Sequence, residues 1–189
     1  MHPIWLIGKK GQLAQTFAQL LRFLQMPYIA TAKEEVDITD LNACVAFAKK
    51  YQFSGLVNCA AYTAVAAAEN DFAKAFALNV QGVANLATIA AQGQMKMLHF
   101  STDYVFGAKE QQQPWQEEEI PQPLNIYGQT KLAGERQLLQ ILPTACIVRT
   151  AWLFSRWGDN FVKKMLRLMQ AQTAITVVSD QVGSPTYAP

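Results

Sequence analysis

The stretch IWLIGKKGQLA, residues 4–14, decides the fold of this 189-residue chain. Its first four residues are apolar, as in a buried strand, and they run directly into two glycines three positions apart. Gly8 permits a tight turn, and Gly11 lets the backbone approach a pyrophosphate at the positive end of a helix expected over 12–25. Ala14, the third small residue, still allows the helix to pack closely on the strand. The stretch therefore favours a dinucleotide site over an ordinary strand-to-helix turn.

Segments typical of strands and of helices alternate along the rest of the chain, with short connections. This alternation predicts an α/β fold, a doubly wound and mostly parallel Rossmann-like sheet with helices on both faces. A hydroxyl N-cap at Thr39 is expected to begin the second helix. Residues 109–119, rich in Gln and Glu, are interpreted as a solvated loop that Trp115 could anchor near a pocket. The expected strands are 28–31, 55–58, 95–101, 145–149 and 175–178, and the further helices are 40–51, 71–91, 126–140 and 160–170.

Composition excludes several classes of function. The chain is 51% hydrophobic, which suffices for one sizeable core. Its net charge is only +2 and no basic cluster is interleaved with aromatic residues, so we expect no nucleic-acid partner. No apolar run approaches the roughly twenty residues that cross a bilayer. The start of the chain lacks the pattern of a signal peptide, so we expect neither export nor a membrane partner.

The cysteines and histidines favour a cytoplasmic protein with no protein-held metal. Cys44, Cys59 and Cys146 are odd in number, far apart and in apolar surroundings, which is typical of reduced core thiols. With only His2 and His99, and no Cys-x-x-Cys, the sequence does not predict a zinc site. His99 lies in an expected strand, where a packed histidine is favoured over a catalytic one.

The pair Tyr127 and Lys131 suggests proton delivery. The two residues are four apart, so on a helix their side chains share one face. An ammonium beside a phenol lowers a pKa that is ordinarily about 10, which would bring the tyrosine into general acid–base chemistry near neutral pH. Two side chains on a solvated helix face are the alternative. The upstream Ser101-Thr102 pair and the glycine-rich turn favour the chemical interpretation.

Three groups of candidate residues follow expected strands. Gly8 and Gly11 follow the first strand, residues 58–62 the third and residues 101–106 the fourth. Ligands of such sheets bind beyond the carboxyl ends of the strands, so we expect these residues to line one cleft for a cofactor and a substrate.

Seven motifs carry a family resemblance. They are Gly8-x-x-Gly11-Gln12-Leu13, Val36-Asp37-Ile38-Thr39-Asp40, Asn58-Cys59-Ala60-Ala61-Tyr62-Thr63-Ala64-Val65, Ser101-Thr102-Asp103-Tyr104-Val105-Phe106, Pro114-Trp115-x-Glu117, Pro123-Leu124-Asn125-x-Tyr127-Gly128-x-Thr130-Lys131-Leu132-x-Gly134-Glu135 and Arg149-Thr150-x-Trp152. In this order they resemble the dTDP-4-dehydrorhamnose reductases, which are extended short-chain dehydrogenase/reductases. The resemblance covers essentially the whole chain.

The resemblance implies a reduction in dTDP-rhamnose biosynthesis, which supplies cell-surface polysaccharides. NADPH would reduce the 4-keto group of dTDP-4-dehydro-β-L-rhamnose to give dTDP-L-rhamnose. Thr102 would donate a hydrogen bond to the ketone, Tyr127 would deliver a proton, and Lys131 would lower the tyrosine pKa and bind the nicotinamide ribose. A homodimer is a possible assembly, and Mg²⁺ is a possible cofactor on family resemblance only.

The site residues are divided into three sets. The catalytic set is Thr102, Tyr127 and Lys131; the cofactor-binding set is Gly8, Gly11, Gln12, Leu13, Asp37, Ile38, Cys59, Ala60, Ala61, Tyr62, Asn79, Tyr127 and Lys131; the substrate-binding set is Thr102, Asp103, Tyr104 and Trp152. We expect residues 1–150 to form the dinucleotide-binding domain with the catalytic residues. Residues 151–189 would supply the last strand and helix of the sheet and the start of a truncated nucleotide-sugar lobe.

Several roles have alternatives. Asp37 either contacts adenine or caps the following helix. Asn79 either lies under the active site or is a surface polar residue, and Trp152 either packs on the sugar or belongs to the core. Residues 30–33, at the end of the second strand, lack the acid that would pair with a ribose 2′-hydroxyl, so NADPH is permitted and Lys33 could meet its phosphate, while NADH is also possible.

Three departures from the family pattern limit the resemblance, and two of them, Ala66 and the shortened lobe, motivate a regulatory function. Ala14 replaces the usual third glycine, Ala66 stands where relatives carry an aspartate, and Pro189 would interrupt the nucleotide-sugar lobe. One alternative is a nucleotide-sugar epimerase or dehydratase of the same superfamily. The other is a non-catalytic, dinucleotide-binding regulatory subunit.

Overall fold

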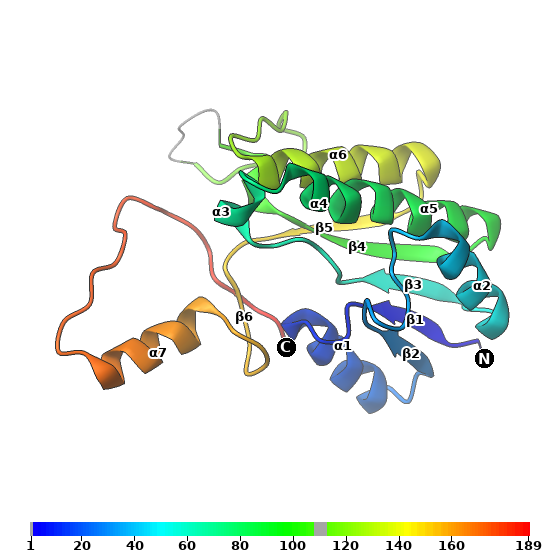
Figure 1. The fold of residues 1–189 in the computed structure, drawn as a ribbon, viewed down its shortest axis with the longest axis horizontal. Coiled ribbons are helices and arrows are strands. Elements are labelled where there is room, and N and C mark those ends of the chain that lie inside the picture. Colours follow the sequence, from blue (N-terminus) through cyan, green and yellow to red (C-terminus); the bar gives the residue numbers. More distant parts are fainter. Residues whose placement is uncertain (1, 108–112) are drawn as a thin grey trace.

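A five-stranded parallel sheet forms the centre of the computed structural model, which describes residues 2–107 and 113–189 (Figure 1). The strand order is β2-β1-β3-β4-β5, so the chain crosses from one side of β1 to the other after β2. The predicted doubly wound α/β class is confirmed. The strands are β1 Ile4–Ile7, β2 Tyr28–Thr31, β3 Gly55–Asn58, β4 Lys96–Thr102 and β5 Cys146–Thr150.

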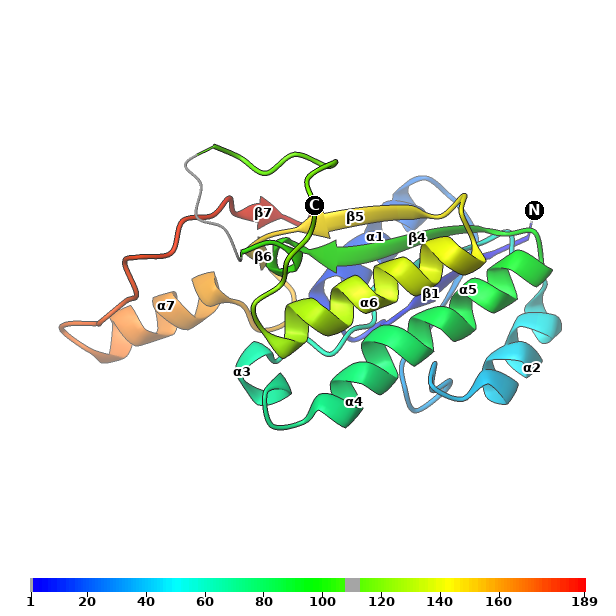
Figure 2. The ribbon, with the colours of Figure 1, turned by 90° about the horizontal axis from the view of Figure 1, so that it is seen from above.

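Helices cover both faces of the sheet (Figure 2). One face packs against α1 (Gln12–Phe23). The other carries α2 (Leu41–Tyr51), α5 (Gly82–Gln92) and α6 (Ile126–Ile141). The helix expected over 71–91 is one helical run in which α4 (Phe72–Phe76) passes through a π-helical turn, η1 (Ala77–Gln81), into α5. Two short elements, α3 (Val65–Ala68) and η2 (Asp103–Val105), were not expected.

Side chains along β1 point alternately to the two faces of the sheet and contribute to two hydrophobic cores. Trp5 and Ile7 point into the cluster beneath α2 and α5, whereas Leu6 points into the smaller cluster beneath α1. Trp5 stacks on Phe53 with ring centroids 5.3 Å apart and donates from Nε1 to the Thr31 hydroxyl at 2.8 Å. Its indole is therefore both packed and hydrogen-bonded, as a buried tryptophan requires.

Side chains cap the helices that carry the site. Asn125 caps α6 by accepting from the Gly128 backbone N–H at 2.7 Å. Asp40 caps α2 by accepting from the Ala43 backbone N–H at 3.0 Å. The expected hydroxyl cap at Thr39 is therefore wrong: the Thr39 hydroxyl donates to Asp37, and the carboxylate one residue later has the cap position.

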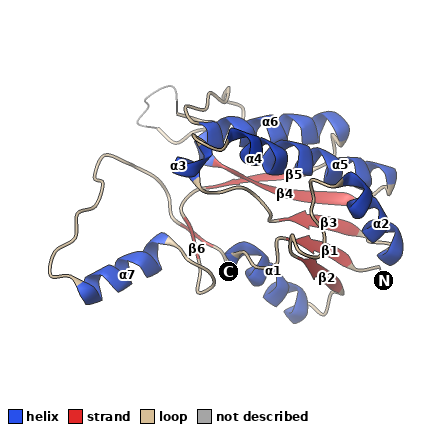
Figure 3. Cartoon of the chain, viewed as in Figure 1, coloured by secondary structure: helices blue, strands red, loops and turns tan. Residues whose placement is uncertain are grey.

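The expected sixth strand over 175–178 is also wrong. Residues 172–185 form neither helix nor strand (Figure 3). Val177 and Val178 are exposed. The chain leaves the sheet after β5, so these β-forming residues meet no strand edge. Instead β6 (Leu153–Phe154) and β7 (Thr186–Tyr187) pair in parallel as a separate two-stranded sheet. Residues 151–189 thus add no strand to the main sheet, while the domain division at residue 150 stays a prediction.

The helix α7 (Phe161–Ala171) stands apart from the sheet and has no buried residue (Figure 1). The outer face of β5 is consequently open, with Cys146 exposed and Val148 37% exposed. Within the described ranges, no helix is both long enough and apolar enough to cross a membrane.

Candidate active site

The strand register brings the predicted site residues to one edge of the sheet. Ile7 at the end of β1 pairs with Asn58 at the end of β3, and Asn58 pairs with His99 on β4. The glycine turn, the segment 58–62 and the segment 101–104 therefore all emerge at the carboxyl edge, where ligands of such sheets bind.

The glycine turn fits a dinucleotide. Gly8 has a φ of +88°, and a Cβ atom there would lie 2.9 Å from the backbone nitrogen of Ala60, so the turn packs directly on the next loop. Gly11 is the N-cap residue of α1 and offers no side-chain cap, which leaves the first N–H groups of the helix for an anion. Ala14 is fully buried in the α1 core, as close helix–strand packing requires, and Leu13 is half-buried.

Gln12 connects the turn to the C-terminal segment. Its Nε2 donates to the Leu153 carbonyl at 3.0 Å, and its Oε1 accepts from Ser155 and from Asn160, each at 3.3 Å. The side chain is therefore occupied by protein groups far along the chain. Gln12 is predicted to bind the cofactor because it belongs to the glycine-rich motif. The sequence carries no signal for its contacts with the C-terminal segment.

Tyr127 is buried beside the residues expected to act with it. Its ring meets Tyr104 edge-on at 5.7 Å, and Thr102 is 4% exposed. A Cβ atom on Gly128 would lie 2.2 Å from the Tyr104 carbonyl oxygen, so only glycine lets α6 approach η2 this closely. Burial raises the pKa of Tyr127; hydrogen bonding with Thr102 opposes the rise, and the charge of Asp103 adds to it.

Lys131 is buried one turn further along α6, with 1% of its surface exposed. Its amine donates to the Phe100 carbonyl at 2.6 Å and lies 3.3 Å from Nε2 of His99. Burial lowers the pKa of Lys131 to about 8, with Glu135 opposing the change. The pKa of Tyr127 is raised overall, because desolvation of the buried phenol is the largest cause, and the expectation that this lysine lowers the tyrosine pKa stays a prediction.

Asn79 braces the site from the π-helical turn. It is 1% exposed, accepts from the Tyr62 backbone N–H at 2.8 Å and donates to the Thr130 hydroxyl at 3.1 Å. The surface alternative is therefore wrong. A Cβ atom on Gly134 would lie 2.1 Å from the Asn79 carbonyl, so α6 and η1 are also in close contact.

The segment that follows β3 is half-buried at Cys59, Ala60 and Ala61. Burial raises the pKa of Cys59 to about 12.

The region after β2 holds acids that the sequence interpretation missed. Glu35 accepts from the Ala32 backbone N–H at 2.7 Å and also pairs with Lys9. An acid is therefore present at the end of β2, although residues 30–33 contain none. It could have been found from its spacing, because a carboxylate three residues ahead can reach back to a backbone N–H.

Asp37 does not cap α2. It accepts from the backbone and hydroxyl of Thr39 and lies 3.4 Å from Lys33. The capping alternative is wrong, and contact with adenine stays a prediction. Lys33 is paired, so a phosphate would have to displace Asp37. Ile38 is 3% exposed and packs in the main core against Gly82.

The predicted sugar-side residues differ in exposure. Asp103 is half-buried, accepts from the Thr102 hydroxyl at 3.2 Å and has its pKa raised by burial. Trp152 is 47% exposed with a φ of +46°, and its ring packs on Gly183. The core alternative for Trp152 is therefore wrong.

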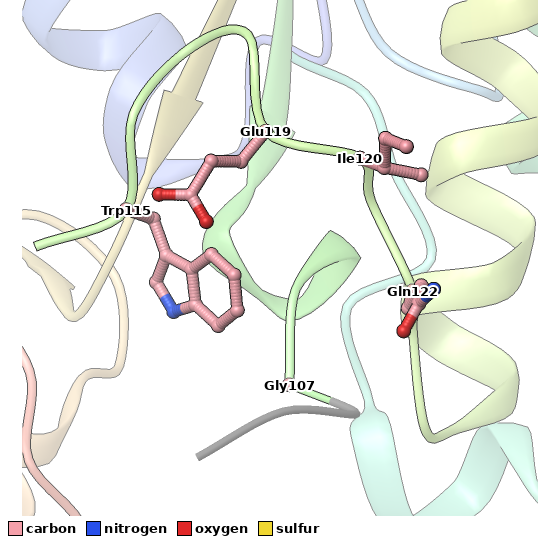
Figure 4. Close-up of a pocket in the computed structure, with 5 residues that line it drawn as sticks. All are labelled: Gly107, Trp115, Glu119, Ile120 and Gln122. Carbon is pink, nitrogen blue, oxygen red and sulfur yellow. The ribbon is translucent and has the colours of Figure 1, made fainter. Parts of the chain in front are cut away.

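A stack of side chains, not foreseen as a unit, borders the site. The Arg149 guanidinium carbon lies 5.0 Å from the centroid of the Phe106 ring. The ring of Trp115 stacks on the ring of Phe106, with centroids 4.8 Å apart. Trp115 also lines a cavity of about 220 Å³, so its expected anchoring role is confirmed. Figure 4 shows Trp115 and Glu119 on one side of this cavity and Ile120 and Gln122 on the other. Residues 109–112 of the expected loop lie outside the described residues.

The described part of the chain contains no cluster of side chains that could hold a metal ion. No three His, Cys, Asp or Glu side chains are grouped there closely enough to hold an ion.

Known proteins match the chain along its whole length. It is 40% identical over 189 residues to a dTDP-4-keto-6-deoxy-D-glucose reductase of Streptomyces niveus, covering 99% of this chain and 65% of the relative. It is 38% identical over 192 residues to a dTDP-4-dehydrorhamnose reductase of Aggregatibacter actinomycetemcomitans, covering 100% of this chain and 64% of the relative. The chain thus spans slightly less than two thirds of these relatives.

Solved structures agree. A dTDP-4-dehydrorhamnose reductase from Bacillus anthracis in complex with NADP superposes with a TM-score of 0.95 at 34% identity, covering 99% of this chain and 66% of that one. The enzyme from Clostridium acetobutylicum gives 0.94 at 36% identity, with 98% and 66% covered. The family model described as the RmlD substrate binding domain matches residues 1–189. On these matches the chain belongs to the RmlD substrate binding domain family, that of the dTDP-4-dehydrorhamnose reductases.

Proposed function

We propose that this chain carries the catalytic half of an NADPH-dependent reductase acting on the 4-keto group of dTDP-4-dehydro-β-L-rhamnose. The observation that carries the proposal is the burial of Thr102, Tyr127 and Lys131 at the same sheet edge as the uncapped glycine turn. The names of the relatives support the substrate, and the NADP complex of the Bacillus anthracis protein supports the cofactor.

The raised pKa of Tyr127 suits a reduction. A buried phenol remains protonated at neutral pH, so it can act as the acid that donates a proton to the ketone oxygen. Thr102 would orient that oxygen by donating a hydrogen bond. The ammonium of Lys131 would stabilise the phenolate left behind. The chemistry that the nicotinamide supplies when bound is hydride transfer.

The glycine turn, α1 and the lysines after β1 and β2 would hold the cofactor. The first N–H groups of α1 suit the pyrophosphate. Lys9, Lys10 and Lys33 are each paired with a carboxylate, Glu35, Glu34 and Asp37 respectively, and the 2′-phosphate of NADPH could replace one of these partners. We place the enzyme in the cytoplasm, where its free cysteines stay reduced, and a homodimer remains part of the proposal.

One assay tests the proposal. The fall in NADPH absorbance with dTDP-4-dehydrorhamnose should be abolished or reduced by about 10²-fold or more in Tyr127→Phe, while NADPH binding is retained. Binding without any turnover would reject the enzyme and favour the regulatory subunit. Unchanged turnover in the variant would reject this mechanism.

The related 4-keto-6-deoxy sugar is a second candidate substrate, because the Streptomyces niveus relative is named for it. Comparing kcat/KM for both dTDP sugars decides between them. An epimerase or dehydratase would instead keep oxidised NAD tightly bound through purification and turn over without consuming NADPH.

A further inference from the structure

Three buried side chains connect β3, β4 and α6 beneath the proposed site. Asn58 and His99 have no exposed surface, and Lys131 has 1%. Nδ2 of Asn58 lies 3.0 Å from Nδ1 of His99, and Nε2 of His99 lies 3.3 Å from the Lys131 amine. The imidazole is therefore the only link between the asparagine and the lysine in the described structure.

The orientation of the Asn58 amide follows from one backbone contact. The N–H of Ala60 lies 3.0 Å from the Asn58 side chain and can only donate, so the atom that it meets is the oxygen. The amide nitrogen then faces His99 and can also only donate. Nδ1 of His99 must accept, which means that it carries no proton.

The proton of a neutral imidazole is then on Nε2, the nitrogen that faces Lys131. His99 is neutral because burial, with Lys131 adding to the effect, lowers its pKa well below the ordinary value. If Lys131 were an ammonium, its N–H groups would face the Nε2–H of His99, and two donors would oppose each other. A neutral amine can accept from Nε2–H while it donates to the Phe100 carbonyl.

We propose that Asn58 and His99 are positioning residues that control the protonation of Lys131: the asparagine holds the imidazole as the Nε2–H tautomer, and this donor disfavours the lysine ammonium. The catalytic consequence rests on the proposed reductase function, but the tautomer does not. Among the described residues, Glu135 on α6 also acts on the charge of Lys131 and is bound by Arg149 on β5, and Tyr127 lies one turn before Lys131 on the same helix. None of these sets the tautomer of His99.

The tautomer can be measured directly. The chain has only two histidines, so long-range ¹H–¹⁵N spectra of protein labelled with [¹⁵N]histidine contain two imidazole patterns, and His99→Gln assigns them. The expected result for His99 is a neutral Nε2–H ring that does not titrate between about pH 5 and 8. An Nδ1–H tautomer, or a His99 ring that titrates, overturns the proposal.

Asn58→Asp tests the control itself. The carboxylate can still accept from Ala60 and now accepts from His99, so the ring should switch to Nδ1–H and offer its Nε2 lone pair to the lysine. Asn125→Asp is the matched control, since it adds the same charge at the N-cap of α6, where aspartate also caps. Its His99 spectrum should equal that of the wild type. A wild-type tautomer in a folded Asn58→Asp protein would contradict the proposal.

The pH profile separates this inference from the proposed function. If the reductase is active, the alkaline fall in kcat/KM should move up by about one pH unit in Asn58→Asp, because the ammonium has gained an acceptor and a nearby anion. Asn125→Asp should leave the profile unchanged. If the Asn58→Asp protein is active and its pH profile is unshifted, Asn58 and His99 do not control the protonation of Lys131. If no protein turns over, the proposed function fails and the ¹⁵N spectra alone decide the tautomer.

Discussion

Arg149 on β5 binds Glu135 on α6 through two hydrogen bonds, Nε to Oε1 at 3.1 Å and Nη2 to Oε2 at 2.7 Å. The carboxylate side chain is 5% exposed and that of the arginine is 26% exposed. Since Glu135 lies one turn from Lys131 and Arg149 lies over Phe106, this pair connects the proposed catalytic helix to the loop that Trp115 anchors.

Arg149→Met should destabilise the fold by about 3 kcal/mol, because it leaves a buried carboxylate without its partner. Chemical denaturation of the two proteins measures the difference. Arg167→Met is the control, since its pair with Asp159 is exposed on both sides and should change little. Equal effects of the two substitutions would show that Glu135 does not depend on the arginine.

Gly128→Ala should lower the free energy of unfolding by about 1–3 kcal/mol and impair reduction, because the new methyl group would overlap the Tyr104 carbonyl. The displaced carbonyl would move the ring that rests against Tyr127. Gln129→Ala, on the exposed side of the next position, should stay within about 0.5 kcal/mol of the wild type. An alanine at 128 that is tolerated in both stability and kcat would show that α6 can withdraw from η2.

Lys131→Met should abolish turnover yet stabilise the fold at neutral pH by up to about 3 kcal/mol, since burial holds the pKa of the lysine at about 8. A base whose folded pKa is depressed binds fewer protons folded than unfolded. Its contribution therefore becomes more favourable as pH rises from about 8 to its ordinary value of 10.5. The stability advantage of the variant should shrink over that window, as measured by denaturation at several pH values. Lys164→Met, at an exposed position, supplies the control; a constant advantage across the window would contradict the depressed pKa.

Asn79→Ala should cost about 2 kcal/mol of stability and weaken NADPH binding, because it leaves the Tyr62 backbone N–H and carbonyl without their side-chain partner and removes the donor to the Thr130 hydroxyl. Thermal or chemical unfolding and a titration of the cofactor measure the two effects. Asn70→Ala, at an exposed position nearby, should have almost no effect on either. Loss of stability with unchanged cofactor binding would confine Asn79 to a structural role.

Local patterns were reliable wherever the determining contacts lie close in sequence. The apolar run before Gly8, the five strands of the sheet and the helical spacing of Tyr127 and Lys131 follow from side-chain periodicity and turn residues. The same local patterns misplaced a strand at 175–178, because a β-forming run becomes a strand only where a partner edge is available. They also predicted a hydroxyl cap for α2, whereas the carboxylate of Asp40 caps this helix in place of Thr39.

The amino-acid sequence by itself determined the parallel α/β sheet, the glycine turn and which side chains reach its carboxyl edge, because each depends on chain periodicity and on residue type. The tertiary structure alone decided the protonation chemistry. Whether Tyr127 and Lys131 are buried, and that His99 and Asn58 come to face the lysine, depends on packing between β3, β4 and α6. Desolvation and donor–acceptor matching arise only when segments distant in sequence exclude water together.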